Sequence, residues 1–309
     1  MRPLETTAMD LPSQVTITEV GPRDGLQNEP SFVTTQIKID FINLLSETGL
    51  KHIEVTSFVS PKAIPQLADN AEVYQGIRKV QGVSYSALIP NEQGMQKAME
   101  LGVQEIAIFT AASESFNQRN INCTIQESIE RFRPVMELAK KHAIPVRAYI
   151  SCVLGCPYEG EIGPAQVMQV VEQLLHLEVN EISFGDTIGV GTPKQTRLLL
   201  DAIKTTMKSN QIAMHFHDTY GQAVANIYAS LECGIHRFDS SVAGLGGCPY
   251  AQGATGNVAT EDVLYLMHGL GIETGVDIYK VVAAGDRICK VLQRKNQSKV
   301  ANALMANPC

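Results

Sequence analysis

The chain has 309 residues, of which 44% are hydrophobic and 18% are charged, as in globular proteins with one large core or two modest ones. Its formal net charge of −7 and the lack of a long lysine or arginine block argue against nucleic acid as a partner, because phosphate binding needs concentrated positive charge. No apolar run reaches the roughly 18 residues of a membrane-spanning helix, and Met1–Gln14 lacks a signal-peptide pattern, so we expect a cytoplasmic protein without membrane contact.

Short apolar or β-branched runs recur along the chain and predict eight β-strands. They lie at Val15–Val20, His52–Phe58, Val83–Ile89, Glu105–Thr110, Val146–Val153, Glu181–Phe184, Ile212–His217 and Arg237–Val242. The stretches between them have room for helices, and helical periodicity is seen at Thr35–Thr48, Thr124–His142, Ala165–Leu177 and Pro193–Met207. Connections of this length favour parallel strands, and eight such units in about 250 residues match an α/β fold of the closed (β/α)₈ (TIM) barrel type.

An open doubly wound sheet is the alternative fold. Such a sheet usually carries a Gly-x-Gly-x-x-Gly loop after its first strand, whereas this chain has Gly21-Pro-Arg-Asp-Gly25 there. We therefore expect a single barrel domain over residues 1–309, with the barrel from about residue 14 to 270, a helical extension from about 276 to 296 and a loose tail to residue 309.

Active sites of such barrels form where the strands end, so polar residues just past each strand are candidates. Arg23 and Asp24 follow the first strand in a tight turn, although a surface ion pair would explain two such residues on their own. His215 and His217 end the seventh strand two residues apart, so both imidazoles point to the same face. One buried histidine is commonly structural, but two on one inward face indicate a shared ligand.

Two imidazoles combined with oxygen ligands suit Mg²⁺ or Mn²⁺ better than they suit a structural zinc site, which usually recruits thiolates. Asp24 is the predicted carboxylate ligand, and Asn257 after the eighth strand can offer an amide oxygen. The same region holds Cys248 in a glycine-rich loop, where we favour a role as proton donor over simple packing. Glu54 and Asp186 are acids inside or just beyond otherwise apolar strands, and either a partner such as Arg23 or a structural hydrogen bond would explain them.

The seven cysteines contain no Cys-x-x-Cys pair, so we expect reduced thiols. Three residues separate Cys152 from Cys156, which fits neither a zinc nor a redox motif, and we assign both to packing together with Cys123 and Cys233. Cys309 is expected to be a free terminal thiol rather than a contact between subunits.

Five motifs together resemble the 3-hydroxy-3-methylglutaryl-CoA lyase family. They occur in the family's order along nearly the whole chain, at Val20–Asn28, Thr56–Pro61, Gly185–Pro193, His215–Gly221 and Gly244–Tyr250. The resemblance implies metal-dependent cleavage of an acyl-CoA thioester, with Asp24, His215, His217 and Asn257 as metal ligands and a homodimer as the assembly. It also implies that Arg23 faces the enolate and that Cys248 donates a proton, with Gln27, Ser57, Ser183 and Thr187 binding substrate.

The base that takes the proton of the substrate alcohol is left open among Asp186, Glu54 and His215. Pro30 stands where some relatives carry a longer polar side chain, so the contacts to the nucleotide end of CoA are not assigned, although Ser115–Asn120 is a candidate segment. The acyl group is hydroxymethylglutaryl or a longer branched homologue. A condensing relative of the isopropylmalate-synthase type and a barrel without catalysis are the alternatives, and Gly244–Tyr250 argues against the first of these.

Overall fold

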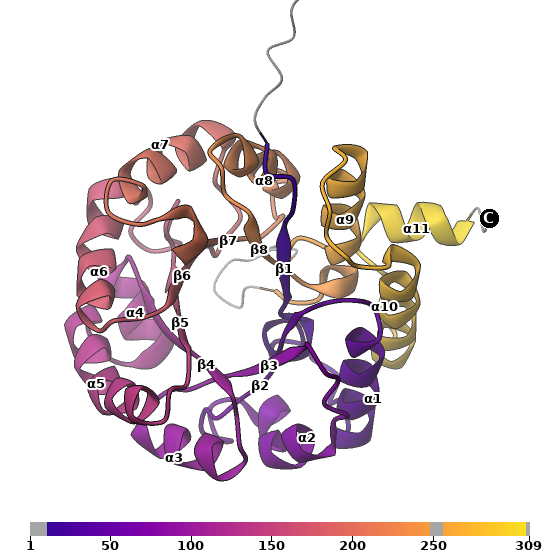
Figure 1. Ribbon diagram of the computed structural model, residues 1–309, viewed down its shortest axis with the longest axis horizontal. Coiled ribbons are helices and arrows are strands. Elements are labelled where there is room, and N and C mark those ends of the chain that lie inside the picture. The colour runs from indigo at the N-terminus through magenta and orange to yellow at the C-terminus, as the bar shows by residue number, and fades with distance from the viewer. Residues whose placement is uncertain (1–10, 248–255, 307–309) are drawn as a thin grey trace, which may run out of the picture.

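The computed structural model describes residues 11–247 and 256–306, and its centre is a closed ring of parallel strands (Figure 1). The strands are β1 (Thr16–Glu19), β2 (His52–Ser57), β3 (Ser84–Leu88), β4 (Glu105–Ala111), β5 (Val146–Ser151), β6 (Glu181–Asp186), β7 (Ile212–Phe216) and β8 (Arg237–Ser240). They pair in chain order, and β8 pairs with β1 to close the ring. This ring confirms the predicted barrel and excludes the open sheet.

Helices surround the ring on its outer side (Figure 1). They are α1 (Thr35–Ser46), α2 (Asn70–Gly76), α3 (Glu92–Glu100), α4 (Glu114–Ile121), α5 (Ile125–Lys141), α6 (Pro164–His176), α7 (Pro193–Ile203), α8 (Ala223–Glu232), α9 (Thr260–Gly269), α10 (Ile278–Leu292) and α11 (Lys299–Ala306). The sequence marks several starts: Thr124 and Glu127 form a reciprocal cap on α5, for example. None of the described helices is long and apolar enough to cross a membrane.

All eight predicted strands are present, and their ends differ from the predictions by a few residues. The eighth was expected to run to Val242 but stops at Ser240, because the chain there curls into the short turn η4 (Val242–Gly244). Ala243 in this turn has a left-handed backbone with φ 58°, which a strand cannot contain. The sixth extends beyond its predicted end, so Asp186 is the last residue of β6 rather than part of a loop.

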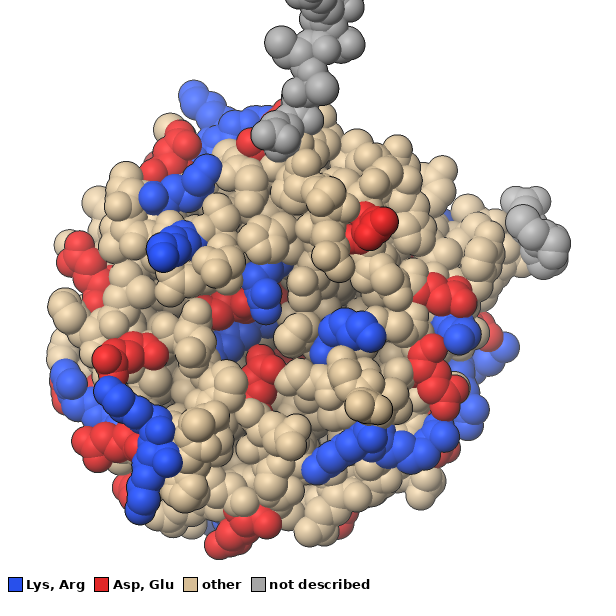
Figure 2. Space-filling view, viewed as in Figure 1, with Lys and Arg blue, Asp and Glu red and all other residues tan. Residues whose placement is uncertain are grey.

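The inside of the barrel contains charged side chains as well as apolar ones. Arg147 on β5 makes ion pairs with Glu181 and with Asp239, and Glu181 also pairs with Arg237 at the start of β8. Figure 2, which views the molecule along the barrel, shows charged side chains of both signs in the hollow at the centre of this face. The large aliphatic core therefore lies between the strands and the helices, and the barrel interior carries polar chemistry.

The chain after the barrel differs from the expected loose tail. The predicted helical extension is present as α10, but residues 299–306 then form α11 instead of an irregular end. Asp262 at the start of α9 explains this helix, because its carboxylate accepts hydrogen bonds from the Ser298 hydroxyl at 2.7 Å and from the Val300 amide at 3.0 Å. The tail that was expected to be loose is thus anchored to α9 through Ser298 and Val300.

Candidate active site

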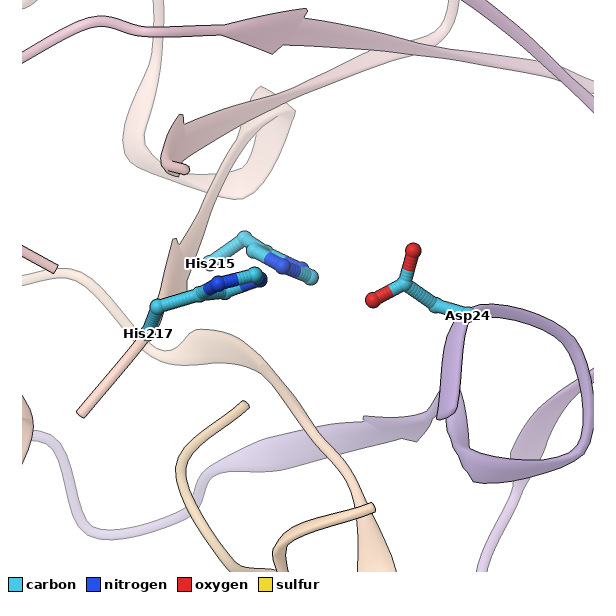
Figure 3. A group of neighbouring side chains, drawn as sticks. All are labelled: Asp24, His215 and His217. Carbon is cyan, nitrogen blue, oxygen red and sulfur yellow. The ribbon is translucent and has the colours of Figure 1, made fainter. Parts of the chain in front are cut away.

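Asp24, His215 and His217 come together at the carboxyl ends of the strands (Figure 3). One potential ligand atom from each lies within 4.8 Å of the others, and both histidines are buried. Nδ1 of His217 is buried with no hydrogen-bond partner, which is costly unless another ligand satisfies it. A carboxylate and two imidazoles in this arrangement fit a divalent metal ion.

Asn257, the fourth predicted ligand, lies beside this group. Its side-chain amide donates to Oδ2 of Asp24 at 2.7 Å and to the carbonyl of Leu245 at 3.1 Å. It also forms a backbone bridge with His217. All four predicted metal ligands are therefore neighbours, although they come from the first, seventh and eighth strand exits.

The turn η1 (Gly21–Gly25) places Asp24 and Arg23. It is a single π-helical turn in which the amides of Asp24 and Gly25 donate to the carbonyl of Val20 at 2.8 Å and 3.1 Å. Gly25 has to be glycine here, because a Cβ would lie 2.8 Å from both Leu245 and Ser241. Such turns are frequent at functional sites, where they aim side chains that a regular helix would direct elsewhere.

Electrostatics keep Asp24 ionised and His217 neutral. Burial raises the pKa of Asp24, but Arg23 and the two imidazoles outweigh it and bring the pKa down to about 2. Burial, helped by His215, lowers the pKa of His217 to about 4. At neutral pH the carboxylate is therefore charged and the His217 imidazole is unprotonated, which are the forms that bind a metal ion.

Arg23 is held between two acids at the edge of the cavity. Its Nη1 contacts Oδ1 of Asp24 at 2.7 Å, while Nε and Nη2 contact Oε2 of Glu54 at 2.7 Å and 2.6 Å. Burial raises the pKa of Glu54, although Arg23 opposes that rise. The guanidinium cannot be deprotonated, so it presents a permanent positive charge to a ligand in the cavity.

Arg23, Asp24, His215 and His217 line a cavity of about 600 Å³. One part of its wall is polar and includes Arg23, Asp24, Gln27, Thr187, His215 and His217. Another part is apolar and includes Val59, Ile64, Leu88, Phe109, Phe116 and Ile121. Concave sites with an apolar wall and a few converging polar groups are typical of small-molecule binding.

Four other predicted site residues lie behind the cavity wall rather than in it. Asp186 is fully buried, and its carboxylate accepts from the amides of Val190 at 3.1 Å and Gly191 at 2.9 Å. Burial raises the pKa of Asp186 to about 6, against the effect of these amides. Glu54, Ser57 and Ser183 are also absent from the lining. The Ser57 hydroxyl accepts a hydrogen bond from the Val59 amide, and the Ser183 hydroxyl donates one to Asp239. Their catalytic and substrate-binding roles stay predictions.

Cys248 lies outside the described residues, but the two ends of its loop are close together. Gly246 and Gly256 both have positive φ, and a Cβ on Gly256 would lie 2.5 Å from the carbonyl oxygen of Gly246. Gly247 belongs to the cavity lining. The five described cysteines, at positions 123, 152, 156, 233 and 289, form no disulfide with one another, in line with the expected reduced thiols.

Sequence reasoning missed three residues of this site: Arg147, Tyr149 and Asp239. The Tyr149 ring lies 5.3 Å and 5.1 Å from the guanidinium carbons of Arg23 and Arg147, and its hydroxyl is 3.2 Å from Oε2 of Glu54. Asp239 lies 3.2 Å from Nδ1 of His215 and so orients that ring. The signal that indicates them is the polar side chains within β5 and β8, since all three residues lie inside strands rather than at strand exits.

The HMGL-like family model matches residues 14–288 of the chain. A 3-hydroxy-3-isohexenylglutaryl-CoA/hydroxy-methylglutaryl-CoA lyase of Pseudomonas aeruginosa is 58% identical over 298 residues, which are 96% of this chain and 99% of that protein. A cytoplasmic 3-hydroxy-3-methylglutaryl-CoA lyase of Mus musculus is 56% identical over 95% of this chain and 85% of its own length. A mitochondrial hydroxymethylglutaryl-CoA lyase of Macaca fascicularis is 54% identical over 98% of this chain and 94% of its own.

Solved structures agree with these relatives. The crystal structure of hydroxymethylglutaryl-CoA lyase from Pseudomonas aeruginosa has a TM-score of 0.94 at 58% identity, covering 96% of this chain and 99% of that one. An HMG-CoA lyase from Acinetobacter baumannii, in complex with coenzyme A and 3-methylmalate, has a TM-score of 0.91 at 36% identity, covering 94% and 95%. The family match, the sequence identities and the common fold lead to one conclusion: this chain belongs to the HMGL-like family.

Proposed function

We propose that this chain is a carbon–carbon lyase that cleaves 3-hydroxy-3-methylglutaryl-CoA into acetyl-CoA and acetoacetate. The observation that carries the proposal is the meeting of Arg23, Asp24, His215 and His217 in the wall of one cavity. The names of the relatives supply the substrate, since proteins with 54–58% identity over nearly the full chain are called lyases of this thioester. A related structure holds coenzyme A, which supports a CoA thioester as the ligand.

The metal ligands in this proposal are Asp24, His215, His217 and the amide of Asn257. A divalent ion such as Mg²⁺ or Mn²⁺ bound there would lower the pKa of the substrate's tertiary alcohol. Asp24 supplies a charged oxygen, and its pKa of about 2 keeps that charge at any working pH. Asp239 holds Nδ1 of His215, which leaves the other ring nitrogen of His215 for the ion.

The alcohol proton needs a base, and Asp186 is the least suited of the three candidates because both its oxygens already accept backbone hydrogen bonds. Glu54 keeps one oxygen, Oε1, without a partner, whereas His215 is needed as a ligand. We therefore favour Glu54, reached either through the Tyr149 hydroxyl, which donates to Oε2 at 3.2 Å, or through a water molecule at Oε1. If so, Glu54→Gln should remove the acidic limb of the kcat/KM profile, while Asp186→Asn should retain it.

Breaking the carbon–carbon bond leaves negative charge on the thioester enolate, and Arg23 is the fixed cation beside the cavity. Its side chain is only 7% exposed, so its charge acts with little screening by water. A proton must then reach the enolate carbon, and we assign its delivery to Cys248. The thiol of a cysteine has an ordinary pKa near 8.5 and can give up a proton at neutral pH.

The decisive experiment measures acetoacetate release from 3-hydroxy-3-methylglutaryl-CoA by metal-stripped protein, with and without added Mg²⁺ or Mn²⁺. We expect activity to return with the metal and to collapse in Cys248→Ser and in His217→Ala. Cys233→Ser is the matched control, because this free thiol lies at the end of α8 outside the cavity lining. No release under any metal condition would rule out this substrate and favour a longer branched thioester before the condensing or non-catalytic alternatives.

A longer branched 3-hydroxyglutaryl thioester is the second candidate substrate. The apolar wall formed by Leu88, Phe109 and Phe116 with its neighbours has the chemistry to contact an alkyl or alkenyl substituent. The relative with 58% identity is named as a lyase for both an isohexenyl and a methyl substrate. Comparison of kcat/KM for the two thioesters tests this, and a ratio below about one hundredth for the longer one would limit the chain to the methyl compound.

We also propose a cytoplasmic location and a homodimer. Relatives of 54–56% identity carry both cytoplasmic and mitochondrial in their names, so location has to be tested by fractionation of cells that contain the tagged chain. Light scattering of the purified protein gives its mass, and a value near the 33.6 kDa of one chain would contradict the dimer.

A further inference from the structure

A side chain from beyond the barrel reaches the rim of the cavity. The helix α10 ends at Leu292, Gln293 takes a left-handed conformation with φ 54°, and the chain then turns back toward the barrel. Arg294 follows, and its guanidinium forms an ion pair with the carboxylate of Glu29. Its Nη2 also approaches the carbonyl of Gly244 at 3.4 Å. Arg294 thus connects the segment after η1 with the exit of β8.

Glu29 makes this ion pair from within the cavity lining. Its side chain is 8% exposed and that of Arg294 is 20% exposed, so the pair is shielded from bulk water on most sides. The lining residues that the structure describes include two carboxylates, Asp24 and Glu29, against one guanidinium, that of Arg23. Asp24 is already paired with Arg23. The charge balance at the rim therefore depends on Arg294.

The charge on Glu29 matters for the ligand of the proposed function, a CoA thioester, and this inference rests on that function. A CoA thioester carries a diphosphate and a 3′-phosphate, so it approaches the cavity as a polyanion. An unpaired carboxylate at the rim would repel it, because like charges within about 10 Å interact appreciably even across water. Since Arg294 is not itself part of the cavity lining, its effect would pass through Glu29.

We propose that Arg294 is a positioning and charge-neutralising residue for thioester binding, which acts by pairing with Glu29. Arg294 contacts the Glu29 carboxylate and the Gly244 carbonyl and cancels the negative charge that Glu29 brings to the cavity wall. Asn28, next to Glu29, donates to the Gly247 carbonyl at 3.0 Å, so a second hydrogen bond joins the segment after η1 to the segment after β8.

The test measures binding of coenzyme A to the full chain by calorimetry, so that it does not depend on turnover. Arg294→Met should raise the Kd by about fivefold to tenfold, as expected from one uncompensated charge near a polyanion. The double variant Arg294→Met with Glu29→Gln should restore the Kd to within about twofold, because no unpaired charge remains. Glu29→Gln alone should bind as tightly as the wild type or more tightly, since it frees the Arg294 cation.

Two controls separate charge from damage to the fold. Arg197→Met removes an ion pair with Glu232 between α7 and α8, away from the cavity lining, and should leave the Kd unchanged. The effect of Arg294→Met should also shrink at about 0.5 M salt, where charges are screened within a few ångströms. If Arg294→Met folds poorly, the tighter or equal binding expected for Glu29→Gln still tests the idea.

The inference is overturned if Arg294→Met binds coenzyme A as the wild type does, if the double variant stays as weak as the single one, or if Glu29→Gln weakens binding. The proposed lyase activity is tested separately by acetoacetate release. A chain that binds coenzyme A with these shifts but releases no acetoacetate would keep this inference and reject the proposed reaction.

Discussion

Replacement of Arg23 by methionine should damage stability and catalysis for different reasons. The variant leaves Glu54, which is 0% exposed, without its cation. Loss of one partner from a buried ion pair costs about 3–5 kcal/mol of unfolding free energy, which corresponds to a fall in Tm of roughly 6–10 °C in a chain of this size. Loss of a cation that faces developing negative charge should lower kcat by about 10²- to 10³-fold.

The assays are urea unfolding of Arg23→Met and of Arg23→Met with Glu54→Gln, and steady-state acetoacetate release by Arg23→Met alone, because Glu54 is the proposed base and its loss would itself lower kcat. The second variant removes the buried charge, so its stability should return toward that of the wild type. The reasoning about stability would be refuted if the double variant stayed as unstable as Arg23→Met. The reasoning about catalysis would be refuted if Arg23→Met raised KM and left kcat unchanged.

Three further predictions address the surroundings of the site. Asp239→Asn should weaken Mn²⁺ binding by about 10- to 100-fold in calorimetry, because Asp239 fixes the His215 ring, and unchanged affinity would remove that role. Burial raises the pKa of Glu19 to about 7, despite three hydrogen bonds that lower it, so the folded chain keeps a proton there that the unfolded chain loses above about pH 4.5. The unfolding free energy should therefore fall by about 3 kcal/mol as the pH rises from about 4.5 to 7. Glu19→Gln should flatten that decline in urea unfolding, and an identical pH profile would contradict the assignment. Gly25→Ala should cost about 1–3 kcal/mol because its Cβ meets Leu245 at 2.8 Å, whereas Gly269→Ala, with open space around it, should not destabilise the fold.

The fold could be predicted because strand and helix periodicities are local properties of the sequence. Each strand is an apolar run with a helix-length segment after it, and parallel pairing follows from those lengths. The meeting of His215, His217 and Asp24 could be predicted for a related reason: the two histidines lie on one face through the two-residue repeat of a strand, and strand exits meet in a barrel. Asp24 lies with them in the structure as expected.

What failed was the prediction of contacts between residues inside the barrel. Arg147 and Asp239 are separated by 92 residues and sit within strands rather than at their exits. Which inward-facing charge meets which depends on register and barrel geometry, and neither can be derived from one sequence. The helix α11 was missed because its anchor, Asp262, lies 37 residues before its first residue, Lys299. Ionisable residues at inward strand positions indicate Arg147 and Asp239 in the sequence, but not the partners that they meet.

The proposed metal ligands lie on both sides of the seam where the barrel closes, and this has a consequence for how the protein folds. Asp24 and Asn257 are hydrogen-bonded although 233 residues separate them, and between them β8 pairs with β1. The four residues meet only after both ends of the chain have joined, which is the step with the longest loop to close. A metal ion held by them would therefore not nucleate folding from either end. It would stabilise the completed ring selectively, and we expect its release to be coupled to opening of the β1–β8 seam before the rest of the barrel unfolds.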